Sequence, residues 1–159
     1  MNKAPFRLGI FALIAGLIAD QASKWWIIYI VMLEPRVIHI TDFFNLVLVT
    51  NRGISFGIFS NFGESIRWIL IVFAISLSVI LFIWLLRTPM RHVAFALGMI
   101  ISGAIGNVID RVRLGAVVDF LDFHAFGWHW PAFNVADSAI TIGVLILMYN
   151  SLRIEKTDR

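Results

Sequence analysis

The sequence predicts a mainly α-helical membrane protein with four transmembrane helices and a small β-rich part on one side of the membrane. Its composition and its four long apolar segments both point to this fold class. Of 159 residues, 60% are hydrophobic and 14% are charged, and the mean hydropathy is +0.87. Because a soluble domain has about 25% charged residues, the deficit implies that lipid covers much of the surface. The length predicts one integral membrane domain over residues 1–159.

Four segments have the length and character of spanning helices, which need about 20 apolar residues. They cover residues 8–31, 66–86, 92–109 and 133–150. The second is the cleanest, since only Ser76 and Ser78 interrupt it. The first follows Lys3 and Arg7, as in a secretory signal peptide. Its apolar residues continue to Val31, however, so we interpret it as an uncleaved helix.

The basic residues predict an orientation, because short cytoplasmic loops are enriched in Lys and Arg. With four spans, three basic groups fall on one side of the membrane. These groups are Lys3 and Arg7; Arg87 and Arg91; and Arg153, Lys156 and Arg159. On the other side, arginines alternate with acidic residues. We therefore expect both termini in the cytoplasm.

Two segments on the outer side do not resemble spans. Residues 37–59 are rich in Val, Ile, Phe and Thr, and turn signals occur at residues 51–53 and 61–63. This pattern predicts a small β-structure at the membrane surface. The second outer segment, residues 111–131, is rich in aromatic residues. We expect it to contain a short interfacial helix.

Several function classes are disfavoured. The net charge of +3 is small and dispersed, and no nucleic-acid-binding motif is present. The chain has no cysteine, which excludes a thiol nucleophile and disulfides. There is no HExxH motif, and the four histidines have no metal-site spacing, so we expect no metal or other cofactor.

Polar side chains within the spans are functional candidates, because lipid makes them costly unless they face the protein interior or water. Here they gather toward the predicted outer side. Asp20 and Lys24 are four residues apart and predict a structural ion pair. Gly98, Ser102 and Gly106 form a ridge of small residues that predicts close helix packing. The remaining polar residues at this level are Asn107, Arg111, Asn134 and Asp137, with Asp119 just before the fourth span.

Asp119 and Asp137 together suggest a chemistry that neither suggests alone. Two neighbouring carboxyl groups do not both ionise easily, so one keeps a proton while the other acts as a base, as in aspartic proteases. The base can activate water, and the acid can polarise a peptide carbonyl and protonate the leaving amine. Intramembrane carboxylates also serve proton relays, so a small proton-coupled transporter or proton-conducting protein is the alternative.

Five short blocks, in order along nearly the whole chain, resemble the lipoprotein signal peptidases (signal peptidase II). They are Asp20-Gln21-Ala22-Ser23-Lys24, Asn51-Arg52-Gly53-Ile54-Ser55-Phe56, Gly106-Asn107-Val108-Ile109-Asp110-Arg111, Val117-Val118-Asp119-Phe120 and Phe133-Asn134-Val135-Ala136-Asp137-Ser138. Many members have Ala at the positions of Ile54 and Ser55, and Gly at the position of Ser102. The catalytic blocks are intact.

The resemblance implies an aspartic endopeptidase of the bacterial cytoplasmic (inner) membrane, with four helices, a β-cradle and an active site near the outer leaflet. Its substrates would be prolipoproteins with a diacylglyceryl-modified cysteine, cut on the N-terminal side of that cysteine. The family's catalytic aspartates fall on Asp119 and Asp137. Substrate-binding or supporting positions fall on Asn51, Gly53, Asn107, Arg111 and Asn134, and Asp20 and Lys24 match a structural block. Other implied partners are membrane lipid and cyclic peptide inhibitors such as globomycin.

Overall fold

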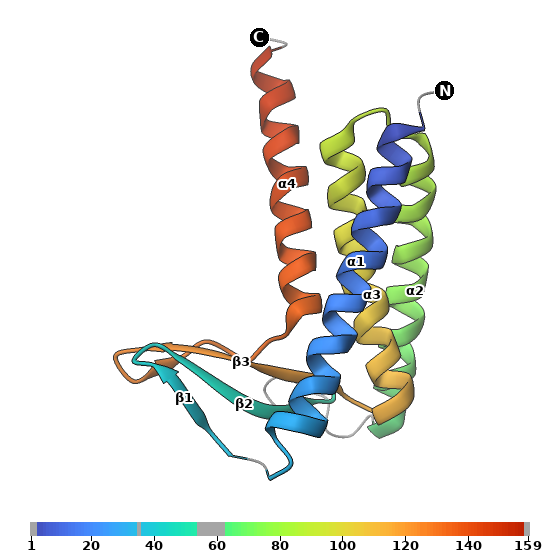
Figure 1. Cartoon of the computed structure of the whole chain (residues 1–159). Helices are drawn as coiled ribbons and strands as arrows, with labels where there is room; N and C mark the ends of the chain where they lie inside the picture. The colour runs from blue at the N-terminus through green and yellow to red at the C-terminus, as the bar shows by residue number, and fades with distance from the viewer. Residues whose placement is uncertain (1–2, 35, 54–62, 158–159) are drawn as a thin grey trace.

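The computed structural model describes residues 3–34, 36–53 and 63–157. Four helices are long and apolar enough to cross a membrane, which confirms the predicted fold class. They are α1 (Ala4–Trp26), α2 (Gly63–Arg87), α3 (Arg91–Leu114) and α4 (Val135–Thr157). A turn of π-helix, η1 (Ile27–Val31), continues α1. The two termini lie at one end of the bundle, and a sheet lies at the other (Figure 1).

Helix α3 is the central helix: most of its length is buried, whereas α1, α2 and α4 expose much of theirs. The predicted ridge of small residues lies on its contact with α1. A Cβ atom at Gly98 would collide with the carbonyl oxygen of Gly9, and one at Gly106 would collide with the Asp20 carboxylate. Ser102 is fully buried and packs where Gly16 leaves room. Small residues thus bring the α1 backbone against α3, as expected for helices packed in lipid.

Within the described residues, the end of the molecule away from the termini carries a four-stranded antiparallel sheet in the order β1-β2-β3-β4. The strands are β1 (Ile38–Thr41), β2 (Phe44–Asn51), β3 (Val117–Ala125) and β4 (Trp128–His129). The predicted β-structure is therefore present, although residues 54–62 lie outside the described part of the chain, including the departures at Ile54 and Ser55. The sheet projects sideways from the bundle (Figure 1).

The prediction of an interfacial helix in residues 111–131 is wrong. Helix α3 continues to Leu114, Gly115 ends it in a left-handed conformation with φ 76°, and the chain then enters β3 and β4. The reason lies in strand pairing. Residues 117–123 alternate between the two faces of the sheet and pair with β2, in a register that places Asp119 opposite Val49 and Asp122 opposite Asn45. The same aromatic residues that suggested an interfacial helix suit this pleated surface.

A small apolar cluster fixes the sheet to the bundle. Ile27 in η1, Met32 and Phe120 on β3 are buried together. Leu46 on β2 and Val135 at the start of α4 pack against them. Because β3 leaves α3 and leads on to α4, this cluster holds the strand near the ends of the helices that lie away from the two termini. The sheet is thereby positioned to deliver side chains to the helix bundle.

Candidate functional site

Two of the predicted site residues, Asn134 and Asp137, stabilise the start of α4. Asn134 immediately precedes the helix, and its side-chain oxygen accepts a hydrogen bond from the Asp137 amide at 2.9 Å. In return, Asp137 Oδ2 accepts the Asn134 amide at 3.3 Å. This reciprocal arrangement is a capping box, which satisfies two amides that a helix start otherwise leaves without partners. It also fixes the Asp137 carboxyl group, with its other oxygen directed toward α3.

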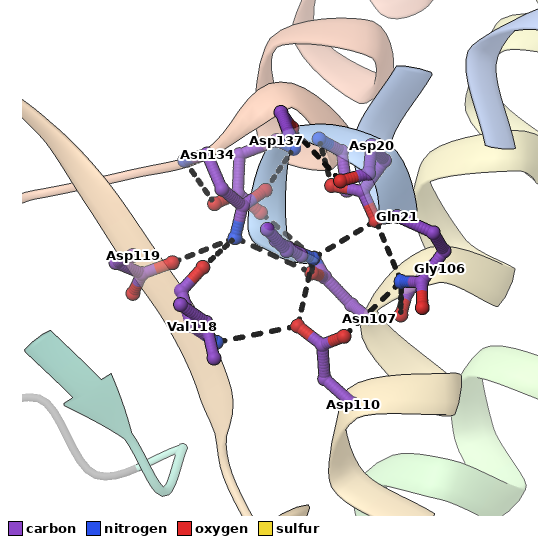
Figure 2. Close-up of polar contacts among 12 residues, drawn as sticks. Asp20, Gln21, Gly106, Asn107, Asp110, Val118, Asp119, Asn134 and Asp137 are labelled. Carbon is purple, nitrogen blue, oxygen red and sulfur yellow. Dashed lines mark hydrogen bonds and ion pairs between the residues drawn. The ribbon is translucent and has the colours of Figure 1, made fainter. Parts of the chain in front are cut away.

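Asn134 also binds the second predicted aspartate. Its Nδ2 donates to Asp119 Oδ1 at 2.6 Å and to the Val118 carbonyl at 3.2 Å. Asp119 comes from β3 and is only 2% exposed, and Asn134 is fully buried. One asparagine therefore joins the two carboxyl groups across 18 residues of sequence, because its side-chain amide donates to Asp119 and its backbone amide donates to Asp137 (Figure 2).

Asn107 on α3 connects the third span to Asp137, Asn134 and Lys24. Its Nδ2 donates to Asp137 Oδ1 at 2.9 Å. Its Oδ1 accepts from Lys24 at 3.1 Å and from Asn134 at 3.4 Å. The lysine fixes the orientation of this amide, because an ammonium group can only donate. Asn107 must then present its NH₂ group to Asp137, as Figure 2 shows.

Lys24 forms the predicted ion pair with Asp20 at 2.9 Å and a second one with Asp110 at 2.8 Å. All three residues are buried. Asp20 also accepts the backbone amide of Ala136 at 2.9 Å. The ion pair on α1 thus reaches α3 through Asp110 and the first turn of α4 through Ala136, and it supports the two elements that carry Asn107 and Asp137.

Asp110 and Gln21 are site-supporting residues that the sequence reasoning missed. Asp110 accepts the Val118 amide at 3.2 Å, next to Asp119, and accepts Gln21 Nε2 at 3.1 Å. The predicted third span stopped at Ile109, which left Asp110 in an outer loop, where a carboxylate needs no partner. Its spacing of three residues from Asn107 was the available signal, since residues three apart share a helix face.

Two further predicted residues, Asn51 and Gly53, form a turn at the end of β2. Asn51 Oδ1 accepts the Gly53 amide at 2.8 Å. Gly53 has φ 86°, and a Cβ there would collide with Leu70 of α2. Glycine is required for both reasons. This turn brings the Asn51 side chain to Asp119, to which it is hydrogen-bonded.

Arg111 lies one helical turn beyond Asn107 and donates to the Asn107 carbonyl at 3.3 Å. Its Nε is buried and has no hydrogen-bond partner within the described residues. A buried donor without a partner is costly, so this N–H is available to an acceptor that enters the site. In the part of the chain that the structure describes, no three His, Asp or Glu side chains are grouped as metal ligands.

The environment of Asp119 raises the pKa of its carboxyl group above that of a free aspartate. Burial raises the pKa of Asp119 to about 6, and the negative charge of Asp137 acts in the same direction. Hydrogen bonds from Asn51 and Asn134 and the positive charge of Lys24 oppose the rise without cancelling it. Carboxyl pairs whose environments separate their titrations are typical of acid–base catalysis.

The fold and this site define a multi-pass membrane protein with two carboxyl groups joined through one asparagine at one end of its bundle. The sequence model of the family described as signal peptidase (SPase) II matches residues 12–153. The chain belongs to this family of lipoprotein signal peptidases and is accordingly a peptidase that removes signal peptides from prolipoproteins. Family membership favours the peptidase over the alternative of a proton-coupled transporter.

Individual relatives agree with this assignment over almost the full chain. The lipoprotein signal peptidase of Methylorubrum extorquens (strain PA1) is 44% identical over 151 residues, which cover 93% of this chain and 87% of the relative. That of Rhodopseudomonas palustris (strain TIE-1) is 43% identical, with 93% of both chains covered. A solved bacterial membrane enzyme structure, determined by the in meso method, has a TM-score of 0.78 and 31% identity, with 91% of this chain and 92% of that chain covered.

Replacing Lys24 tests whether the buried ion pairs support the site. We expect Lys24→Ala to lower the thermal midpoint in detergent strongly, because it leaves Asp20 and Asp110 without their cation; breaking a buried pair costs about 3–5 kcal/mol. The turnover per folded molecule should fall much less than the yield. Lys3→Ala, a charge change at the opposite end of α1, is the matched control. A normal midpoint with a collapsed rate would place Lys24 in the active site instead of in its structural support.

Proposed function

We propose that the protein is an aspartic endopeptidase that cuts on the N-terminal side of the diacylglyceryl-modified cysteine of prolipoproteins, with Asp119 and Asp137 as its catalytic pair. The observation that carries the proposal is the double role of Asn134, which binds Asp119 with its amide while it caps the helix that presents Asp137. The raised pKa of Asp119 supports a division of labour in which Asp119 holds the shared proton and Asp137 is the base.

In this mechanism a water molecule lies between the two carboxyl groups. Asp137 removes a proton from the water as its oxygen attacks the peptide carbonyl, and Asp119 gives its proton to the carbonyl oxygen. The resulting tetrahedral diol collapses when the proton on Asp137 passes to the leaving nitrogen and a hydroxyl proton returns to Asp119. The C–N bond breaks, the shared proton is restored, and no covalent enzyme intermediate is formed.

The same region supplies groups that can hold the substrate backbone. The Nε–H of Arg111, which has no partner within the described residues, can donate to a substrate carbonyl, and Asn51 is hydrogen-bonded to Asp119. We expect the signal peptide to enter laterally from the membrane, with the diacylglyceryl chains remaining in lipid. A cyclic peptide such as globomycin would inhibit by occupying this backbone site. The chain would lie in the bacterial inner membrane with the site near the outer leaflet.

Conservative replacement of either aspartate tests the catalytic pair. Asp119→Asn and Asp137→Asn keep the shape of the side chain but remove the titratable group, so each should abolish cleavage of a lipidated prolipoprotein. Asp122→Asn, on the same strand as Asp119 but outside the site, is the matched control and should keep activity. Turnover of purified protein in detergent is the measurement, with folding checked by circular dichroism. Near wild-type turnover in either site variant would remove that residue from the catalytic pair.

The pH dependence tests the shared proton. Burial raises the pKa of Asp119 to about 6, so the acid is lost as the pH rises through this value. The value of kcat/KM should therefore decline as pH rises, with an apparent pKa near 6, and should also decline in acid once the pair is doubly protonated. These two apparent values belong to the pair. A rate that keeps rising through the alkaline range, with the enzyme folded and the substrate intact, would rule out this mechanism.

Membrane orientation can be mapped with single cysteines, because the chain has none of its own. Cysteines near residue 3 and residue 156 should be protected from a membrane-impermeant thiol reagent in intact cells, whereas a cysteine at Thr50 should react. The expected pattern follows from the basic residues around the two termini. Labelling of either terminal cysteine in intact cells would contradict the proposed topology.

A further inference from the structure

The sheet has two chemically different faces. On one face a polar row crosses all four strands, because His39, Asn45, Asp122 and His129 are joined in turn by hydrogen bonds of 2.8, 2.9 and 2.8 Å. Burial acts to raise the pKa of Asp122, but hydrogen bonds from Asn45 and His129 outweigh it and hold the pKa below its usual value. The polar row therefore keeps a charged carboxylate at its centre.

The opposite face is aromatic. Phe44 and Phe123 are opposite one another in the strand register, with ring centres 4.8 Å apart. Trp128 precedes His129 on β4 and so projects to the face opposite it. Trp130 follows the strand, and its amide donates to the Phe123 carbonyl at 2.8 Å. Trp128 is 83% exposed and Trp130 is 70% exposed. Rings of this kind are enriched where a membrane protein meets the lipid headgroups.

The tip of the β3–β4 hairpin presents one more aromatic side chain at a cost in backbone energy. Ala125 pairs with Trp128, so the loop is the two residues Phe126 and Gly127. Both have positive φ, 52° and 80°. A two-residue turn of this kind favours Asn-Gly, and a bulky residue in this region is an outlier. Phe126 is nevertheless fully exposed, so neither the turn nor the protein core accounts for it.

We propose that the aromatic face and this tip, consisting of Phe123, Phe126, Trp128 and Trp130, insert into the interfacial layer of the bilayer that the four helices span. The sheet projects sideways from one end of the bundle (Figure 1), where Trp25, Trp26 and Trp68 are also exposed on α1 and α2. The aromatic face lies at the same end of the bundle as these tryptophans and is continuous with lipid-facing helices, so it meets the lipid headgroup region. The polar row then lies on the face of the sheet that is turned away from the bilayer.

The insertion gives the sheet a second attachment besides its apolar contact with the bundle. Strand β3 carries Asp119 near one end and leads to Phe126 at the other, about 23 Å away at 3.3 Å per residue. Holding both ends keeps the strand parallel to the membrane plane and Asp119 at a constant depth. For a substrate whose scissile bond lies beside a lipid anchor, this depth sets whether the bond reaches the carboxyl pair; this consequence rests on the proposed function.

Insertion itself can be measured without reference to catalysis. A cysteine at Phe126, labelled with an environment-sensitive fluorophore, should be quenched by lipids with a spin label near the headgroup and protected from iodide in phosphatidylethanolamine–phosphatidylglycerol vesicles. A label at Phe73, exposed in the middle of α2, is the lipid reference. A label at Asp42, which lines a polar groove with His39 and His124, is the water reference. Full iodide access at position 126 would overturn the proposal.

The consequence for turnover is tested with Phe126→Asn, which suits the turn better and removes the apolar anchor. We expect normal folding, unchanged kcat and a several-fold higher KM for lipidated substrate in vesicles, with no difference in detergent. Trp84→Ser, which removes an exposed aromatic at the other end of α2, is the matched control. If position 126 is inserted but KM is unchanged, the depth-setting role is refuted while insertion stands. Loss of cleavage by the wild-type protein itself would refute the proposed function instead.

Discussion

The buried lysine is the constraint on which the rest of the site depends. A cation inside a membrane-spanning helix must be neutralised, and Lys24 achieves this with Asp20 from its own helix and Asp110 from α3. Each carboxylate then has accepting capacity left, which it uses for the backbone: Asp20 for Ala136 at the start of α4, and Asp110 for Val118 on β3. Charge neutralisation on α1 thereby fixes the two elements that carry the proposed catalytic carboxyl groups.

This arrangement separates two functions among acidic residues that look alike in sequence. Asp20 and Asp110 are paired with a cation and bonded to backbone amides, so their charge is compensated within the protein. Within the described residues, Asp119 and Asp137 receive neutral amide donors, from Asn51 and Asn134 to Asp119 and from Asn107 and the Asn134 backbone to Asp137. Amides orient a carboxyl group without fixing its charge, which leaves this pair free to exchange a proton. The proposed chemistry therefore depends on Lys24 forming its ion pairs with Asp20 and Asp110 rather than with Asp119 or Asp137.

Much of this could be predicted from the sequence, and the failures have physical reasons. The spans follow from composition, since lipid requires long apolar helices, and the Asp20–Lys24 pair follows from helical spacing. The strands of residues 117–129 could not be read in the same way, because their pairing depends on β2, some 70 residues earlier in the chain. Asp110 was missed because hydropathy ended α3 too soon. The polar row across the sheet also depends on the strand register, so no local sequence pattern predicts it.

The capping box has a further consequence for how the site could be observed. The Asn134 amide donates to one oxygen of Asp137, while the other oxygen receives Asn107. When a carboxylate takes up a proton, it becomes a weaker acceptor, so the electron density at the Asn134 amide must respond to each protonation of Asp137. This amide is a built-in spectroscopic indicator: its nitrogen chemical shift would follow the charge of a single carboxyl group inside a membrane protein, with no label attached to the reacting residues.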